Sequence, residues 1–365
     1  MNSNKPLTCI FSILFSIVIF VSLPSLITAS SSVTAVFAFG DSTIDAGNNN
    51  GLPTLFRSDH APYGKDFPNQ LATGRFSNGK LSTDFMVSSL GLKDQLPAYF
   101  NPNITDSDLL TGVTFASAGC GLDDITVNLA EVFSMSRQLD YFDEAVMRIM
   151  KLVGEEKGKI IVENSIYVIS VGTNDMVDNF YELPTRRLQF SLSDYQDFLL
   201  HQLESVVQRL YKAGGRKFIF VGLPPIGCLP VQVTLGSIVP SGHMFQRVCV
   251  EQQNTDSIAY NMKLQTLATG LETSNDLKGA KVAYLNVYDS MMDMINNPAK
   301  YGLTRTLEGC CGSGVVEMGP LCNSMEAICG DASKYMFWDA VHPTQPAYYV
   351  ISQLAIQTVF PHLLA

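Results

Sequence analysis

Residues 36–50 read VFAFGDSTIDAGNNN and change abruptly from apolar to small and polar residues. The apolar part, residues 33–39, is short and rich in β-branched and aromatic residues, which predicts a buried strand. Gly40 permits a sharp turn, so Ser42 follows directly after the strand end. Ligands of open α/β sheets bind outside the carboxyl ends of the strands, which makes Ser42 a candidate nucleophile. The alternative interpretation is that Asp41 and Ser42 cap a following helix.

Strand patterns alternate with helical patterns along the rest of the chain. Strands are expected at residues 165–171, 217–223 and 282–287, and helices at residues 129–153, 193–213 and 345–360. Residues 109–122 indicate a short strand that runs into a glycine-rich turn, and the charged run 155–159 indicates a solvated loop. Such alternation is typical of right-handed βαβ crossovers, so it predicts an α/β fold with a mainly parallel sheet covered on both faces. Because no low-complexity linker divides the chain, residues 30–365 are expected to form a single domain.

The charge of the chain limits its partners. It has 34 acidic and 24 basic residues among 365, a formal net charge of −10, and its Lys and Arg residues are not clustered. A protein that binds nucleic acid or an anionic membrane surface usually carries a basic patch. We therefore expect neither of these partners.

The N-terminus has the features of a secretory signal. Lys5 precedes the apolar run 10–23, and the small residues Ala29, Ser30 and Ser31 follow it. Residues 1–29 are therefore expected to be removed, leaving a secreted protein with no integral membrane segment. The alternative, a retained anchor, is disfavoured because the run is shorter than the roughly 20 residues that a spanning helix needs. Asn103 begins an Asn-x-Thr sequon and is the predicted glycosylation site.

Cysteine usage agrees with an oxidising compartment. Of the 8 cysteines, Cys9 lies within the signal, Cys228 and Cys249 form a candidate pair, and Cys120 is the candidate free thiol. The others gather in one stretch: Cys310, Cys311, Cys322 and Cys329. These four indicate local disulfides, with a connectivity that the sequence leaves open. A zinc site is not indicated, since the cluster has neither a Cys-x-x-Cys pair nor a histidine.

An Asp-x-x-His motif lies near the C-terminus, at Asp339 and His342. One turn of chain can bring the carboxylate to the Nδ1–H of the imidazole, which fixes the tautomer and leaves Nε2 free to take a proton from a hydroxyl. Among the histidines of the mature chain, only His342 has an aspartate at this spacing. By itself the motif is equally compatible with a structural loop histidine.

Four stretches in chain order, taken together, resemble the GDSL family of SGNH hydrolases: Gly40-Asp41-Ser42, Phe115-Ala116-Ser117-Ala118-Gly119, Gly172-Thr173-Asn174-Asp175 and Asp339-x-x-His342. Residues 37–50, 73–79 and 223–228 are similar to the plant secreted GDSL esterase/lipase branch. The resemblance implies a flavodoxin-like, three-layer α/β/α sandwich. It also implies hydrolysis of acyl or lipid esters through an acyl-enzyme intermediate.

The family pattern assigns a role to each matching residue. Ser42 would be the nucleophile, His342 the general base and then acid, and Asp339 its orienting partner. The oxyanion hole would comprise the backbone N–H groups of Ser42 and Gly119 and the side-chain amide of Asn174. These roles agree with the need of ester hydrolysis for an activated hydroxyl and fixed oxyanion donors.

The sequence departs from the family pattern in two places. Thr43 stands where the family name has Leu, next to the nucleophile but outside the proton transfers. Ala118 stands where many members have Gly, which leaves a one-residue shift of the backbone oxyanion donor open.

Three other functions compete with ester hydrolysis. An acyltransferase would use the same triad, and an inactive secreted binding protein would be expected to lack one of Ser42, Asn174 and His342. A metal-dependent phosphoesterase could use Asp41, Asp45, Asp339 and His342, but residues 45–51 do not fit a calcium loop and no paired ligand cluster supports two metals. No metal or other cofactor is expected. The loops at 48–78 and 229–248 should form the substrate pockets, while the substrate and the oligomeric state stay open.

Overall fold

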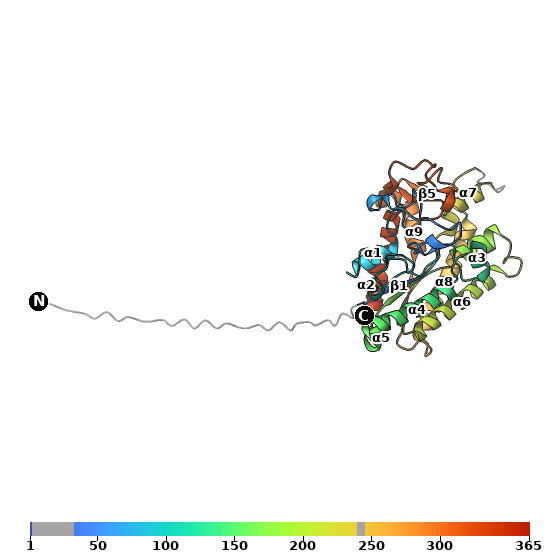
Figure 1. Ribbon diagram of the computed structural model, residues 1–365. Helices are drawn as coiled ribbons and strands as arrows, with labels where there is room; N and C mark the ends of the chain where they lie inside the picture. The colour runs from blue at the N-terminus through green and yellow to red at the C-terminus, as the bar shows by residue number, and fades with distance from the viewer. Residues whose placement is uncertain (2–32, 239–244) are drawn as a thin grey trace. The chain divides into compact units, whose positions relative to one another are not determined.

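The computed structural model describes residue 1 and residues 33–238 and 245–365 (Figure 1). Its central sheet contains four parallel strands in the order β1-β2-β3-β4. They are β1 (Val36–Gly40), β2 (Ile166–Ser170), β3 (Lys217–Val221) and β4 (Lys281–Leu285), and each overlaps the strand predicted for it. Because the strands are parallel, their carboxyl ends meet at one edge of the sheet. The predicted signal, residues 1–29, lies outside the described residues apart from residue 1.

A further segment extends the sheet beyond β1. The backbone N–H of Ala38 donates to Val113 O (3.2 Å), that of Phe115 to Ala38 O (2.8 Å) and that of Ser117 to Gly40 O (2.9 Å). Residues 113–117 therefore run parallel to β1 on the side away from β2. With this segment counted, the strand order is 2-1-3-4-5, which is the flavodoxin-like order. The α/β fold with a parallel sheet is as predicted.

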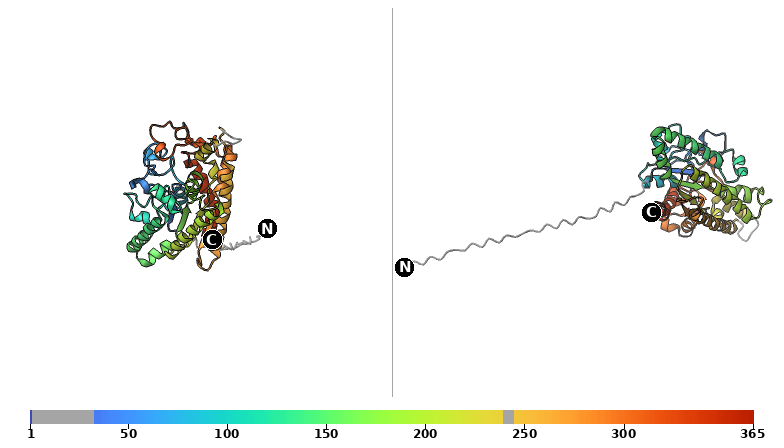
Figure 2. Two further views of the ribbon diagram at one scale, coloured as in Figure 1. Left: turned by 90° about the vertical axis from the view of Figure 1, so that its right-hand side faces the viewer. Right: turned by 90° about the horizontal axis from the view of Figure 1, so that it is seen from below.

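Helices cover both faces of the sheet (Figures 1 and 2). One layer contains α4 (Met135–Val153), α6 (Leu192–Lys212) and α8 (Glu251–Thr273). The other contains α1 (Ser82–Ser89), α9 (Val287–Asn296) and α10 (Gln345–Leu354). This arrangement is the predicted three-layer α/β/α sandwich.

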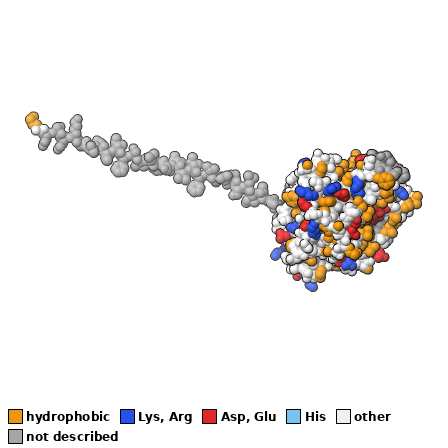
Figure 3. All heavy atoms as spheres, turned by 90° about the horizontal axis from the view of Figure 1, so that it is seen from above, with side chains coloured by type: hydrophobic (Ala, Val, Ile, Leu, Met, Phe, Trp, Pro, Cys, Tyr) orange, Lys and Arg blue, Asp and Glu red, His pale blue; other side chains and the backbone are white. Residues whose placement is uncertain are grey.

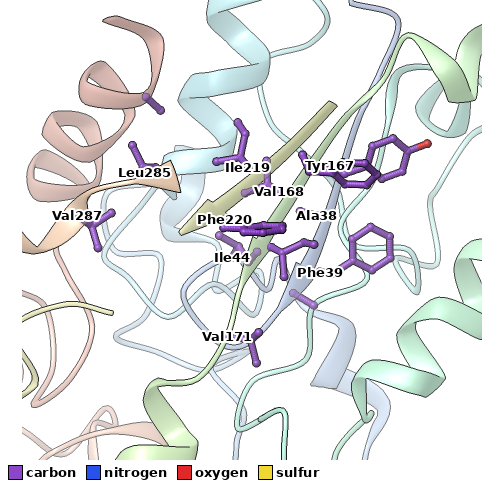
Figure 4. Close-up of a cluster of buried hydrophobic side chains, with 14 of the residues drawn as sticks. Ala38, Phe39, Ile44, Tyr167, Val168, Val171, Ile219, Phe220, Leu285 and Val287 are labelled. Carbon is purple, nitrogen blue, oxygen red and sulfur yellow. The ribbon is translucent and has the colours of Figure 1, made fainter. Parts of the chain in front are cut away.

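Side chains alternate between the two faces along each strand, as the pleat requires. Phe37, Phe39 and Tyr167 pack on Phe142 of α4, with ring centroids 5.2, 5.5 and 5.6 Å away. In Figure 4 the rings of Phe39 and Tyr167 turn toward the green helices of this layer. Val168, one residue after Tyr167, faces the α1 and α10 layer, where it lines a cavity with Met86 and Ile351.

The remaining elements surround this core. The other α-helices of the described residues are α2 (Asp106–Thr111), α3 (Asp124–Ala130), α5 (Glu155–Glu163), α7 (Pro230–Ile238) and α11 (Phe360–Leu364). A second parallel pair consists of β5 (Arg305–Gly309) and β6 (Tyr335–Phe337). None of the helices in the described ranges has the length and apolar character needed to cross a lipid bilayer. Figure 3 shows basic and acidic side chains interspersed among apolar ones on the face that it presents.

The structure corrects the expected loop at residues 155–159. These residues begin α5, with Glu155 and Glu156 in its first turn. Carboxylates are favourable there because the N-terminus of a helix carries a partial positive charge. Glu155 also pairs with Lys159 one turn later, at 2.6 Å. The charge run is therefore the start of a solvated helix rather than a loop.

Some helix boundaries also differ from those expected. The pattern at 129–153 divides into α3 and α4, because Ser134 caps α4 by accepting a hydrogen bond from the backbone N–H of Arg137. Part of the stretch 109–122, expected to be a strand, is helical as far as Thr111. The final helical region continues past residue 360, since Pro361 lies in the first turn of α11, where its missing N–H has no cost.

The described part of the chain contains three disulfides, and they resolve the connectivity that the sequence left open. Cys228 pairs with Cys249, as predicted. Within the cluster, Cys310 pairs with Cys329 and Cys311 with Cys322. Cys120 is buried and is the free thiol within the described ranges. The two cluster disulfides tie together the stretch that leads from β5 to β6, just before Asp339.

Candidate active site

The turn after β1 fixes Ser42 at the carboxyl end of the sheet. Gly40 has a φ of +140°, and a Cβ at this position would lie 1.8 Å from the carbonyl oxygen of Ser170. Only glycine therefore lets β1 end so close to β2. The carboxylate of Asp41 then accepts hydrogen bonds from the N–H (3.0 Å) and hydroxyl (2.7 Å) of Thr43, which closes the turn. Residues 41–44 form turns and bends, so the interpretation as a helix cap is wrong.

The imidazole of His342 lies between Ser42 and Asp339. Its Nε2 is 2.8 Å from Ser42 Oγ, although the two residues are 300 positions apart in the sequence. Its Nδ1 is 2.9 and 2.8 Å from the two carboxylate oxygens of Asp339. All three side chains are buried. In the tautomer that donates from Nδ1 to Asp339, Nε2 is free to accept the hydroxyl proton of Ser42.

Each oxygen of the Asp339 carboxylate has further donors. Oδ1 accepts from the backbone N–H groups of Val341 (2.8 Å) and His342 (2.7 Å). Oδ2 accepts from the hydroxyl of Tyr63 at 2.7 Å, and that hydroxyl in turn accepts from the N–H of Gly319 at 2.8 Å. These bonds hold the carboxylate in place against the imidazole.

Tyr63 is a site residue that the sequence did not indicate. It lies in a Pro-Tyr-Gly stretch that predicts only a turn, and no spacing connects residue 63 with residue 339. Burial, together with the charge of Asp339, raises the pKa of Tyr63 well above its usual value. The phenol therefore stays protonated and acts as the donor to Asp339.

The stretch 117–121 and the residues after β2 supply polar groups next to Ser42's loop. The side-chain amide of Asn174 donates to the carbonyl of Cys120 at 2.9 Å, which joins the two loops. The N–H of Ala118 donates to Asp45 at 3.0 Å. By contrast, the N–H groups of Ser42 and Gly119 have no acceptor among the described residues. A shift of the backbone oxyanion donor from Gly119 to Ala118 is therefore disfavoured, because the N–H of Ala118 already donates to Asp45.

Residues 45–49 position the loop at residues 117–121, called the second loop below. Their residue types alone did not indicate this function. Asp45 accepts from the N–H groups of Gly47 and Asn48, both at 2.7 Å. The amide of Asn48 donates to the carbonyls of Thr114 (2.9 Å) and Ala116 (2.7 Å), and that of Asn49 donates to the carbonyl of Ala118 (2.9 Å). These bonds fix the backbone on both sides of Ser117.

Two buried carboxylates support the loops and are made less acidic by their surroundings. Burial raises the pKa of Asp45 to about 6 and that of Asp175 to about 7, in each case against backbone hydrogen bonds that lower it. Asp175 accepts from the N–H groups of Leu122 (2.8 Å) and Asp123 (3.0 Å) and from the hydroxyl of Thr126 (2.6 Å). Asp175 thus anchors the end of the second loop directly beside Asn174.

The residues considered for a metal-dependent phosphoesterase are engaged in other contacts. Asp45 and Asp339 accept hydrogen bonds from backbone N–H groups through their carboxylates. The described ranges contain no group of three or more His, Cys, Asp or Glu side chains arranged to hold a metal ion. A binuclear site therefore has no donor set in this part of the chain.

The chain is similar to proteins of one family over nearly all of its length. The family model described as GDSL-like lipase/acylhydrolase matches residues 36–354. A GDSL esterase/lipase of Arabidopsis thaliana is 53% identical over 364 residues, which are 99% of each chain. Another from the same plant is 43% identical over 91% of this chain and 90% of its own. Among solved structures, the lipase Lip_vut3 from a goat rumen metagenome aligns with 90% of this chain and 98% of its own, at 11% identity and a TM-score of 0.37.

Proposed function

Because the chain belongs to the GDSL lipase/acylhydrolase family and is a carboxylic ester hydrolase, we propose that Ser42, His342 and Asp339 are its catalytic triad. The observation that carries this proposal is the unbroken line of contacts from Ser42 Oγ through both imidazole nitrogens to the Asp339 carboxylate. This is the geometry of a nucleophile, a base and an orienting group, each within hydrogen-bond reach of the next.

In the proposed mechanism, Ser42 Oγ attacks the ester carbonyl carbon while His342 Nε2 takes the hydroxyl proton. The tetrahedral intermediate collapses, the C–O bond to the alcohol breaks, and His342 returns the proton to the departing oxygen. Water then attacks the acyl-serine with His342 again as base, which releases the carboxylic acid and restores Ser42. The carboxylate of Asp339 stabilises the imidazolium that forms in each half of the reaction.

We assign the oxyanion hole to the N–H groups of Ser42 and Gly119 and to the side-chain amide of Asn174. Support comes from the two N–H groups that lack an acceptor within the described ranges, and from the contact between Asn174 and Cys120 that holds the loops together. The Asn174 amide has two N–H bonds, so its bond to Cys120 leaves one for the substrate. Each such donor typically contributes about 10²–10³ in rate.

The experiment that tests the triad compares the mature protein with its Ser42→Ala variant on p-nitrophenyl esters. Activity that depends on Ser42 supports the acyl-enzyme route, and equal rates would contradict it. Small-molecule esters are the substrate class of this family. The relatives are named esterases/lipases, which favours water over an alcohol as the acyl acceptor.

The Tyr63→Phe variant is expected to lower kcat roughly tenfold with little change in KM, in line with the loss of one hydrogen bond to a charged group. The substitution removes the hydroxyl donor from Asp339 Oδ2. A carboxylate with one donor fewer is held less firmly against Nδ1 of His342, so the imidazole is oriented less precisely toward Ser42. The loss should therefore fall on kcat rather than on KM.

A matched control for this variant is Tyr181→Phe, which removes a 2.9 Å bond to Asp256 instead. It should leave kcat and KM unchanged. If Tyr63→Phe lowers the unfolding midpoint without a selective loss of kcat, Tyr63 only supports the local fold and its positioning role is wrong.

We propose that residues 30–365 form a single catalytic domain that is secreted after removal of residues 1–29. In support, Ser31–Ala365 form one compact unit, and the three disulfides suit an oxidising compartment. Asn103, the proposed glycosylation site, is exposed. N-terminal sequencing of protein collected from the medium should begin near residue 30, and endoglycosidase should lower its mass. An intact residue 1 would contradict the proposal.

A further inference from the structure

A cavity of about 70 Å³ lies between the sheet and the layer of α1, α9 and α10. Apolar side chains from the sheet, from the loops after its strands and from α1, α9 and α10 line it, among them Ile44, Met86, Val168, Leu285, Met291 and Ile351. Figure 4 shows Ile44, Val168 and Leu285 in the buried cluster at this part of the sheet. Protein cores are otherwise packed as densely as organic crystals, so an apolar space of this size calls for an explanation.

The cavity reaches the loops that carry the proposed active site. Thr43, which follows Ser42, is part of its wall, and so is Thr173, which precedes Asn174. Val341 and Pro343, on either side of His342, also line it. The neighbours of the nucleophile, the base and an oxyanion donor therefore meet at this one space.

The other end of the cavity is closed. Val168, Leu285 and Met86 are each 1% exposed, and Ile44 is 2% exposed. By contrast, Thr43, Thr173 and Val341 at the catalytic loops are partly exposed. The partly exposed wall of the cavity therefore lies at the catalytic loops, and its buried wall lies deeper, between the sheet and the helices.

We propose that this cavity binds the acyl chain of the ester, an inference that rests on the proposed role of Ser42. The acyl group stays attached to Ser42 between the two half-reactions, whereas the alcohol must leave and water must approach from its side. A closed apolar space suits the acyl group, which stays attached to Ser42, but would trap the alcohol, which must leave. The ligand class is an unbranched aliphatic acyl chain, because the deep wall offers methyl and methylene groups.

The size of the cavity limits the length of the chain. A buried water needs about 10–15 Å³ of such space, so 70 Å³ holds roughly five waters or an aliphatic chain of roughly five or six carbons. Hexanoate esters should therefore be better substrates than acetate esters. Palmitate esters should have no higher kcat/KM than hexanoate esters, because the rest of the palmitoyl chain would lie outside the cavity.

Two substitutions change the cavity in opposite directions. Met86→Ala enlarges the closed end and should raise the decanoate-to-hexanoate ratio of kcat/KM at least about tenfold, the usual effect of methylene groups in an apolar pocket. Val168→Phe fills the cavity and should lower the hexanoate-to-acetate ratio by a similar factor. Matched controls are Met135→Ala and Val207→Phe, buried in α4 and α6 across the sheet. Neither control should change these ratios.

A second ester series holds the acetyl group constant and varies the alcohol. Met86→Ala and Val168→Phe should leave this series unchanged. If the two substitutions change the rates of the alcohol series instead of the acyl series, the acyl assignment is wrong. It is also wrong if they change the rates of neither series while hydrolysis still depends on Ser42. In both cases the proposed triad is unaffected. Loss of Ser42 dependence would instead contradict the proposed function itself.

A measurement on the unsubstituted protein avoids any effect of the substitutions on folding. Inactivation by p-nitrophenyl alkylphosphonates should become faster from the methyl to the hexyl compound. A crystal structure of the hexyl adduct on Ser42 should place the alkyl chain against Val168 and Met86. An alkyl chain that lies on the surface of the adduct would overturn the proposal.

Discussion

The Ser42→Ala variant is expected to lose ester hydrolysis by about 10⁴–10⁶-fold while it keeps its fold. The hydroxyl is the only group on Ser42 that can form the acyl-enzyme, and His342 then has no proton to accept from it. The remaining activity should reflect the oxyanion donors and substrate binding alone, which still accelerate hydrolysis over water by about 10³–10⁴. The turn itself should survive, because it depends on Gly40 and on the Asp41–Thr43 bonds.

The measurement is kcat/KM on p-nitrophenyl hexanoate, with the thermal unfolding midpoint as the check on folding. Ser88→Ala is the matched control, since Ser88 is exposed on α1. This control should retain full activity. Mass spectrometry should also detect an acyl adduct on the unsubstituted protein, and its absence from Ser42→Ala would locate it. A Ser42→Ala variant that hydrolyses within tenfold of the parent would refute the serine mechanism.

The Asp339→Asn variant is expected to lower kcat by about 10⁴ with nearly unchanged geometry. Two backbone N–H groups donate to Oδ1, so the amide oxygen of Asn must take that position. The new NH₂ group then occupies the Oδ2 position and faces Nδ1 of His342. This NH₂ group competes with the oxygen at Oδ1, 2.9 Å from Nδ1, and favours the tautomer in which Nδ1 accepts and the proton sits on Nε2, where it cannot serve as a base toward Ser42.

The Tyr63 hydroxyl, which donates to Oδ2 in the parent protein, would have to turn and accept from the new NH₂ group. Asp94→Asn, at an exposed position, is the matched control and should be neutral. Circular dichroism and the unfolding midpoint should show that the Asp339→Asn protein is folded. Activity within tenfold of the parent would mean that Asp339 neither fixes the tautomer nor stabilises the imidazolium.

Local sequence features determined the scaffold well. The strand over residues 33–39, and those that follow it, are short apolar runs ended by glycine or polar residues, and such patterns depend on residues a few positions apart. The same locality explains the placement of polar groups at strand ends and the Asp339–His342 spacing. Where prediction failed, a local competitor was overlooked: Ser134 ends one helical pattern and starts another, and residues 155–159 begin a helix that their charges favour.

The sequence by itself determined the class of fold, the family and the residues that could perform serine chemistry. Only the tertiary structure decided that Tyr63 supports Asp339, that Asn49 holds the carbonyl of Ala118, and that a closed cavity lies behind Thr43. The physical reason is that helix and strand periods act over a few residues, whereas these contacts join positions tens to hundreds of residues apart. Such partners have no fixed spacing, and they meet only once the sheet and its two helical layers are packed.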